Sequence, residues 1–200
     1  DTIQEVLTNP LLSGECNISL DMFIMTTDFL KQVVLEAISK NQKSLIRDLL
    51  QARKDEFVFK AYEHKGCFYK IDSLEAYYKA NLALLDTKIR NNVFNSEAPI
   101  YTKVGDNAPV KYGLESNVKN SLVADGCMIE GTAENCVLFR GVKIAKGAVV
   151  RNCVLMQGTE IGEGCNIDAI VADKNVTISA NRVLTGSPEY PLYLGKKATI

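Results

Sequence analysis

The chain of 200 residues is poor in the patterns that usually mark a metal or redox site. It contains a single histidine, His64, and none of its six cysteines forms a CxxC pair. Neither a zinc knuckle nor a redox dithiol is therefore supported, and no metal site is expected. Because a small buried thiol packs like other small apolar side chains, we interpret the cysteines as reduced packing residues of a cytoplasmic protein.

An excess of one charge and long apolar runs are also lacking. The formal net charge is −1, which gives no indication of nucleic acid or an anionic membrane as a partner. No run reaches the roughly 18 apolar residues that a membrane-spanning helix needs, and no secretory signal is recognisable. A chain that begins with Asp1 rather than Met is expected to be a trimmed piece of a longer protein.

A short motif occurs four times in the second half of the chain. The copies begin at Asn120, Asn135, Asn152 and Asp168, so successive starts lie 15, 17 and 16 residues apart. A small residue and two aliphatic residues follow each start: Ser121-Leu122-Val123, Cys136-Val137-Leu138, Cys153-Val154-Leu155 and Ala169-Ile170-Val171. A period of this length is too short for a helical repeat and fits one turn of a β-solenoid.

An isoleucine column supports the stacking of coils. In three copies a small residue follows the isoleucine by four positions: Ile129/Ala133, Ile144/Ala148 and Ile161/Cys165. Thr177 interrupts this column in the fourth copy. The rhythm is typical of a left-handed parallel β-helix, in which three short strands form each triangular coil. An antiparallel meander is the alternative, but a meander alternates apolar and polar residues without preserving columns at a fixed period.

Two adjacent apolar columns predict that one face of this β-helix is covered. Adjacent strand residues point to opposite faces of a sheet, and the third and fourth positions of the motif are apolar in all four copies. A strand that is apolar on both faces is usually buried on both. We therefore expect one face of the solenoid to pack against another domain or subunit.

The first half has the mixed pattern of an α+β structure. Its apolar spacing and capping residues predict five elements: a strand over 17–25, a helix over 29–40 capped by Asp28, a second helix capped by Ser44, a strand over 57–64, and a helix from a capping box at Asp72 and Glu75 to about Leu85. Residues 91–117 contain two prolines and two glycines, which is typical of a connection. The expected domains are 1–92, a linker over 93–117, and a β-helix over 118–200.

Residues 66–81 read Gly-Cys-Phe-Tyr-Lys-Ile-Asp-Ser-Leu-Glu-Ala-Tyr-Tyr-Lys-Ala-Asn. They resemble a segment of the ADP-glucose pyrophosphorylases, and residues 100–104 and 109–131 resemble the linker and first coils of the same enzymes. The resemblance implies the C-terminal part of a nucleotidyltransferase domain followed by a left-handed parallel β-helix. Enzymes of this family join glucose 1-phosphate and ATP into ADP-glucose and pyrophosphate with Mg²⁺, and they work as tetramers.

The departures from the family pattern concern its catalytic groups. The Gly-rich nucleotide loop and the sugar-phosphate lysine of the family are not present in these 200 residues. Ser44 stands at the position of an aspartate that binds Mg²⁺, and Lys70 stands at the position of another aspartate. A hydroxyl is a poor substitute for a carboxylate at a hard cation. These changes resemble the GlgD-type subunit, which pairs with a catalytic subunit and modulates it.

The resemblance therefore implies a structural and regulatory part of an ADP-glucose pyrophosphorylase subunit in glycogen biosynthesis. We expect no catalytic residue and no cofactor in this chain, although Mg²⁺ is expected for the full family enzyme. The expected partners are a catalytic subunit, further copies of the chain bound through the β-helix, or both. The alternative is a fragment of a catalytic sugar-phosphate nucleotidyltransferase subunit.

Four residues are candidates for ligand contacts. Ser19 matches a serine on the sugar side of the family's site, although an ordinary strand hydroxyl is an equal explanation. Lys143, Lys146 and Arg151 fall in one coil and are candidates for binding a phosphorylated effector, with solvated coil edges as the alternative. A hexapeptide-repeat acyltransferase is a further alternative. Such enzymes use a coil histidine as general base, whereas His64 lies outside the repeats.

Overall fold

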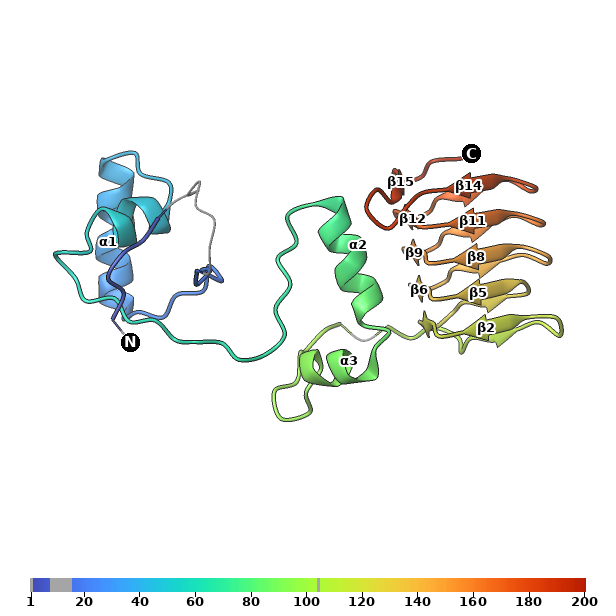
Figure 1. Cartoon of the computed structure of the whole chain (residues 1–200), viewed down its shortest axis with the longest axis horizontal. Coiled ribbons are helices and arrows are strands. Elements are labelled where there is room, and N and C mark those ends of the chain that lie inside the picture. The colour runs from blue at the N-terminus through green and yellow to red at the C-terminus, as the bar shows by residue number, and fades with distance from the viewer. Residues whose placement is uncertain (1, 8–15, 104) are drawn as a thin grey trace. The chain divides into compact units, whose positions relative to one another are not determined.

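The computed structural model describes residues 2–7, 16–103 and 105–200. It divides into two compact units, Asp1–Lys65 and Gly66–Ile200, and the elements of both are labelled in Figure 1. Within the described ranges, no helix is both long and apolar enough to cross a membrane.

The described part of the first unit contains two helical segments. Helix α1 spans Thr27–Ser39 and the π-helical segment η1 spans Ile46–Gln51. They share a small core with Val33, Leu49 and Leu50 as its buried residues. The helix positions were close to those expected, because the apolar stripe of α1 recurs at helical spacing.

Several expected details of the first unit are wrong. Thr26, not Asp28, caps α1, and its hydroxyl accepts a hydrogen bond from the N–H of Phe29. No strand is formed in the described ranges 17–25 or 57–64, where the only pairing is an antiparallel bridge between Thr2 and Lys60. A strand is stable only when neighbouring strands satisfy its backbone groups, and alternation alone does not supply those partners.

The second unit begins with two helices. Helix α2 spans Leu74–Ala83 and helix α3 spans Thr87–Val93. The cap of α2 is Ser73 rather than the expected Asp72, because the Ser73 hydroxyl accepts the N–H of Ala76. The sequence prediction missed α3, which Asp86 caps by accepting the N–H of Lys88.

In the described residues after α3, fifteen short strands follow and build a β-helix of parallel strands. Their bounds are β1 Lys111–Tyr112, β2 Asn117–Lys119, β3 Leu122–Val123, β4 Met128–Ile129, β5 Thr132–Glu134, β6 Val137–Leu138, β7 Lys143–Ile144, β8 Val149–Arg151, β9 Val154–Leu155, β10 Glu160–Ile161, β11 Asn166–Asp168, β12 Ile170–Ala172, β13 Thr177–Ile178, β14 Val183–Thr185 and β15 Leu192–Leu194. The coils stack one upon another in Figure 1. The predicted fold class is thereby confirmed as a parallel β-helix preceded by a few helices.

Each coil contributes one strand to each of three sheets. The first sheet has the order β1-β4-β7-β10-β13, the second β14-β11-β8-β5-β2 and the third β15-β12-β9-β6-β3. Every named pairing is parallel, so the N–H and C=O groups of one coil bond to the next. Inside, the sheets bury the predicted isoleucine column at Ile129, Ile144 and Ile161.

The register corrects the fourth copy of the motif by one residue. Val171, not Ile170, pairs with Val154, so the corner equivalent to Asn152 is Ala169 rather than Asp168. The isoleucine column also continues, because Ile178 pairs with Ile161 where Thr177 was expected to interrupt it. A shift of one residue exchanges the two faces of a strand, which is why a motif match alone misplaced this coil.

The two compact units do not divide where the domains were expected. The second unit starts at Gly66 and includes α2 and α3, because α2 packs against the solenoid. The β-helix also begins with β1 inside the expected linker, since Lys111 pairs with Met128. The expected domains 1–92 and 118–200 stay a prediction about the parent protein.

Candidate functional site

The outer face of the third sheet is covered by α2. Tyr78 of this helix is 2% exposed and packs on Val137, Val154 and Val171. Figure 1 shows α2 along the side of the solenoid that carries β6, β9 and β12. The prediction that the doubly apolar strands are covered on both faces is therefore confirmed, and the cover is a helix of the same chain.

A ladder of side-chain amides runs along the neighbouring corner. Asn120 donates from Nδ2 to Oδ1 of Asn135 at 2.7 Å, Asn135 to Oδ1 of Asn152 at 3.2 Å, and Asn152 to Oδ1 of Asp168 at 2.8 Å. The three asparagines adopt φ values of 42°, 55° and 49°. Asparagine tolerates this left-handed conformation better than most residues, so one residue type both turns the corner and joins the coils.

The covered face affects the protonation of tyrosines on α2. Burial raises the pKa of the Tyr78 hydroxyl to about 12. Burial likewise raises the pKa of Tyr77, and the nearby carboxylate of Asp173 adds to that rise. Both phenols are therefore neutral at ordinary pH, and the Tyr78 hydroxyl is a hydrogen-bond donor to the solenoid backbone.

The cysteines of the repeats are packing residues, as predicted. Cys127, Cys136, Cys153 and Cys165 are free thiols with 0% exposure. Each thiol donates to a backbone carbonyl, for example Cys153 to Arg151 at 2.8 Å. Burial raises the pKa of Cys153, which disfavours a reactive thiolate. Cys16 and Cys67 are exposed, so the packing interpretation was wrong for these two.

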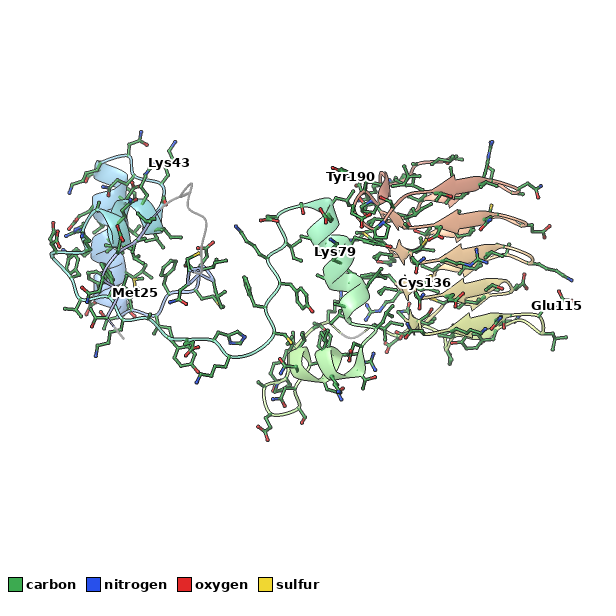
Figure 2. All side chains as sticks on the ribbon, viewed as in Figure 1. Met25, Lys43, Lys79, Glu115, Cys136 and Tyr190 are labelled. Atoms are coloured by element: carbon green, nitrogen blue, oxygen red, sulfur yellow. The ribbon has the colours of Figure 1, made fainter. Side chains whose placement is uncertain are left out.

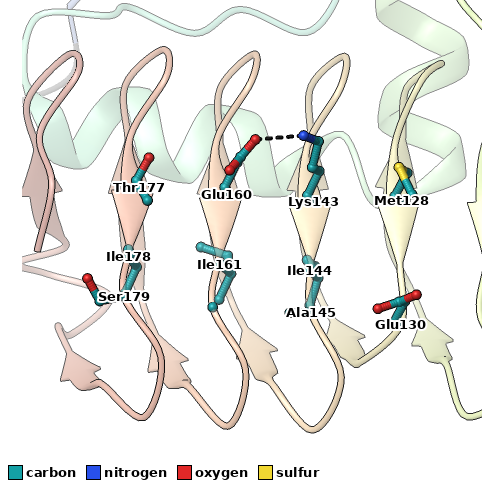
Figure 3. Close-up of a pocket in the computed structure, with 11 residues that line it drawn as sticks. Met128, Glu130, Lys143, Ile144, Ala145, Glu160, Ile161, Thr177, Ile178 and Ser179 are labelled. Carbon is teal, nitrogen blue, oxygen red and sulfur yellow. Dashed lines mark hydrogen bonds and ion pairs between the residues drawn. The ribbon is translucent and has the colours of Figure 1, made fainter.

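The outer face of the first sheet remains open and bears a shallow depression of about 370 Å³. Its lining alternates long and small side chains, as Figure 3 shows for Met128, Lys143 and Glu160 beside Ala145 and Ser179. Lys143 of β7 donates to Oε1 of Glu160 of β10 at 2.7 Å, the dashed line of Figure 3. The outer face of the first sheet thus carries an ion pair beside a strip of small side chains.

The structure does not bring the three candidate cations together. Lys143 lies on the first sheet and Arg151 on the second, with Lys146 on the turn between them. Each has a carboxylate partner: Lys143 pairs with Glu160 at 2.7 Å, Lys146 with Glu115 at 3.1 Å and Arg151 with Glu134 at 3.9 Å. Glu115 is labelled at the outer edge of the first coil in Figure 2. The structure therefore contains no convergent phosphate site made from this set.

Ser19 is exposed and belongs to a local turn of the first unit. Its hydroxyl accepts the N–H of Asp21 at 3.2 Å and lies 3.4 Å from the carboxylate of the same residue. These contacts serve the turn, in which Asp21 has a φ of 56°. A role of Ser19 in sugar binding stays a prediction.

The Ser44 hydroxyl, just before η1, accepts the N–H of Arg47 at 3.2 Å. In return, the carboxylate of Asp48 accepts the N–H groups of Lys43 and Ser44. Hydrogen bonding from Arg47 and from these N–H groups holds the pKa of Asp48 well below its usual range. In the described residues, no group of three or more His, Cys, Asp or Glu side chains is placed to hold a metal ion.

The sequence prediction missed the contact between Tyr78 and the solenoid and the role of the asparagine corners. The first had no local signal, because Tyr78 and Asn152 are 74 positions apart. The second had one: asparagine opens three copies of the motif, and asparagine is a residue that accepts positive φ.

Residues 108–189 match the family described as "GlmU-like, C-terminal hexapeptide". This range contains the solenoid from just before β1 to just after β14. The match agrees with the hexapeptide rhythm and with the three-sheet coils described above.

Among curated proteins, the chain is similar to "Glycogen biosynthesis protein GlgD" of Bacillus subtilis (strain 168), with 43% identity over 178 residues, which are 89% of this chain and 52% of that protein. It is 58% identical over 71 residues to the protein of the same name from Geobacillus stearothermophilus, covering 36% of this chain and 21% of that protein. It is also 39% identical over 110 residues to "Glucose-1-phosphate adenylyltransferase" of Geobacillus stearothermophilus, covering 54% and 27%.

The match to the Bacillus subtilis relative covers most of this chain. The chain nevertheless spans only about half the length of that relative. The identity is higher to the two GlgD proteins than to the adenylyltransferase. These findings confirm the resemblance expected from residues 66–81 and from the repeats. The chain is therefore similar in sequence to proteins of the ADP-glucose pyrophosphorylase (glucose-1-phosphate adenylyltransferase) family, and among them it resembles the GlgD type.

Proposed function

We propose that this chain is a structural and regulatory part of an ADP-glucose pyrophosphorylase subunit that acts in glycogen biosynthesis. In the full complex, glucose 1-phosphate and ATP would form ADP-glucose and pyrophosphate, with Mg²⁺ as the metal. The observation that carries the proposal is the 43% identity over 89% of the chain to a protein named for glycogen biosynthesis. The chain itself is proposed to be non-catalytic.

The local chemistry of Ser44 in the first unit and of Lys70 in the second unit supports the non-catalytic part of this proposal. The Ser44 hydroxyl is engaged with the N–H of Arg47, and a hydroxyl is a weak ligand for Mg²⁺ in any case. Lys70 pairs with Asp72 at 3.5 Å, so a cation stands at the position where the family pattern has a carboxylate. Both positions carry aspartate in the resemblance to catalytic subunits described above.

The proposed regulatory role consists in holding the subunits of the complex together. A solenoid of flat stacked strands gives long, rigid faces, and rigid faces are suited to hold subunits in register. A catalytic subunit, further copies of this chain, or both are the proposed partners. The three candidate cations would bind a phosphorylated effector only by giving up their carboxylate partners, so effector binding by Lys143, Lys146 and Arg151 is a minor part of the proposal.

A fragment of a catalytic subunit is the competing function, and the 39% identity to an adenylyltransferase favours it. The two functions differ in one measurable respect. A regulatory part changes the behaviour of a separate catalytic subunit, whereas a catalytic fragment competes with that subunit or replaces it.

The experiment combines the 200-residue chain with the glucose-1-phosphate adenylyltransferase of Geobacillus stearothermophilus. ADP-glucose formation from glucose 1-phosphate, ATP and Mg²⁺ is measured for each protein alone and for the mixture, and size-exclusion chromatography follows co-elution. We expect no turnover by the chain alone, co-elution with the enzyme, and a changed KM or kcat in the mixture. Turnover by the chain alone, or a mixture without co-elution and with unchanged kinetics, would overturn the proposal.

A further inference from the structure

The outer face of the first sheet consists of two rows of side chains. One row is Lys111, Met128, Lys143, Glu160 and Thr177, and the other is Gly113, Glu130, Ala145, Gly162 and Ser179. The second row is small in four of its five positions, so the sheet surface is low there. This is the strip that forms the depression of about 370 Å³ in Figure 3.

The rows are self-complementary about a two-fold axis. Consider an axis that runs along the strands, midway between β7 and β10, in the plane of contact. Rotation about it reverses the order of coils and leaves the strand direction unchanged. Lys143 of each copy then faces Glu160 of the other copy. In the same way, Ala145 of each copy faces Gly162 of the other. An isologous interface requires this reciprocity of partners.

The next coils continue the complementarity. The same rotation places β4 against β13 of the second copy. Met128 then faces Thr177, which is an apolar side chain against a methyl-bearing one, and Glu130 faces the hydroxyl of Ser179. Across these four strands no pair of like charges meets, and Ala145 and Gly162 meet each other, which lets the two sheets approach closely at the centre.

The other two faces are less suited to a second copy. The third sheet is already covered by α2, whose Tyr78 is 2% exposed. The second sheet carries a charged side chain in four consecutive coils: Lys119, Glu134, Arg151 and Asp168. The first sheet also carries four charged side chains, Lys111, Glu130, Lys143 and Glu160, but the second sheet has no row of small residues and so no low strip along which two copies could approach closely.

We propose that the outer face of the first sheet is a self-association surface on which a second copy of this chain docks in two-fold, strand-aligned fashion. The reciprocal Lys143–Glu160 contacts lie at its centre. This inference deepens the assembly role proposed above and rests on it for the expectation that copies associate. It names the face, the symmetry and the central residues of the interface.

The test measures the mass of the 200-residue chain by sedimentation equilibrium across a range of concentrations. The unmodified chain is expected to shift with concentration from 22.0 kDa to twice that mass. Ala145→Arg places a long side chain on the low strip and is expected to hold the chain at the monomer mass. Gly162 is left unchanged, because a Cβ there would lie 2.6 Å from the backbone nitrogen of Ala180.

A charge exchange tests the central contact itself. Lys143→Glu alone places like charges both within the chain and across the axis, so it is expected to weaken the dimer at least tenfold in Kd. The double variant Lys143→Glu with Glu160→Lys restores opposite charges at both places, and is expected to recover the dimer. Arg151→Glu on the second sheet is the matched control, and it is expected to leave the dimer mass unchanged.

Several outcomes would overturn the proposal. One is a chain that stays monomeric at every concentration, and another is a dimer that survives Ala145→Arg. A third is a dimer that Arg151→Glu dissociates, since that would assign the contact to the second sheet. Thermal unfolding of each variant shows that the solenoid is intact. Failure here is distinguishable from failure of the proposed function, because co-elution with the adenylyltransferase and altered kinetics are measured separately and do not require self-association.

Discussion

The hydroxyl of Tyr78 donates a hydrogen bond of 2.7 Å to the backbone carbonyl of Asn152. Asn152 is a member of the corner ladder, with a φ of 49°. A helix from the expected nucleotidyltransferase portion is thereby joined to the middle of the solenoid. Lys79 of the same helix and Cys136 of the solenoid are labelled in Figure 2.

Two substitutions of Tyr78 should destabilise the second unit to different degrees. Tyr78→Phe is expected to cost about 1 kcal/mol, because the carbonyl of Asn152 loses its donor, and Tyr78→Ala about 3–5 kcal/mol, because a large buried ring is lost. Chemical denaturation followed by circular dichroism measures both. Tyr101→Ala, at a residue that is 90% exposed, is the control and should stay within about 0.5 kcal/mol. Equal losses for Tyr78→Ala and Tyr101→Ala would contradict the packing of α2.

The raised pKa of Tyr78 predicts a loss of stability at alkaline pH. The pKa rises from 10.0 to about 12 in the folded protein, so the folded state binds the proton more tightly than the unfolded state. The stabilising contribution is therefore complete below pH 10 and is lost as the pH rises towards 12. Unfolding free energies of the unmodified chain and of Tyr78→Phe, compared across this window, isolate the contribution from those of other tyrosines. Parallel pH profiles for the two proteins would argue against it.

The interior and exterior of a coil should respond differently to truncation. Ile144 is 1% exposed and stacks in the central column, so Ile144→Ala is expected to cost about 2–5 kcal/mol. Lys146, two residues on, is exposed in its pair with Glu115, and Lys146→Ala is expected to cost less than about 0.5 kcal/mol. Thermal melting of both variants measures the difference. Melting shifts of the same size would mean that the inside and outside of the coil are wrongly assigned.

At the corner asparagines, substitution by glycine should destabilise the protein less than substitution by alanine. Asn135 has a φ of 55° and joins Asn120 to Asn152. Both substitutions lose the ladder contacts, but alanine also pays the steric cost of the left-handed conformation, so it should destabilise by roughly 1 kcal/mol more than glycine. Denaturant midpoints of the two variants decide this. An alanine variant as stable as the glycine variant would show that the corner has relaxed to negative φ.

Much of the solenoid could be predicted because its signal is local and repeated. The isoleucine at the centre of each coil recurs every 15 or 17 residues, as in Ile129, Ile144 and Ile161, and such a column has no other simple explanation. The fourth coil was misplaced by one residue because Ala169 occupies a corner where the other copies have asparagine. Only the hydrogen-bond register, which pairs Val171 with Val154, identifies the true equivalent.

The candidate site was less predictable, because it depends on distances that the sequence does not contain. Lys143, Lys146 and Arg151 are close in sequence and were grouped for that reason. A solenoid turns through a corner within those nine residues, however, and so distributes them over two sheets and a turn. Their carboxylate partners come from other coils, 17 to 31 positions away in the chain: Glu160, Glu115 and Glu134.

The sequence by itself determined that the second half is a stack of β-coils and that one outer face must be covered, because both follow from the period and from side-chain alternation. It also determined the resemblance to the ADP-glucose pyrophosphorylases, through residues 66–81. Only the tertiary structure decided that α2 is the cover and that the first sheet is left open. The physical reason is that burial depends on which surfaces meet in space, and residues such as Tyr78 and Asn152 are brought together only by folding.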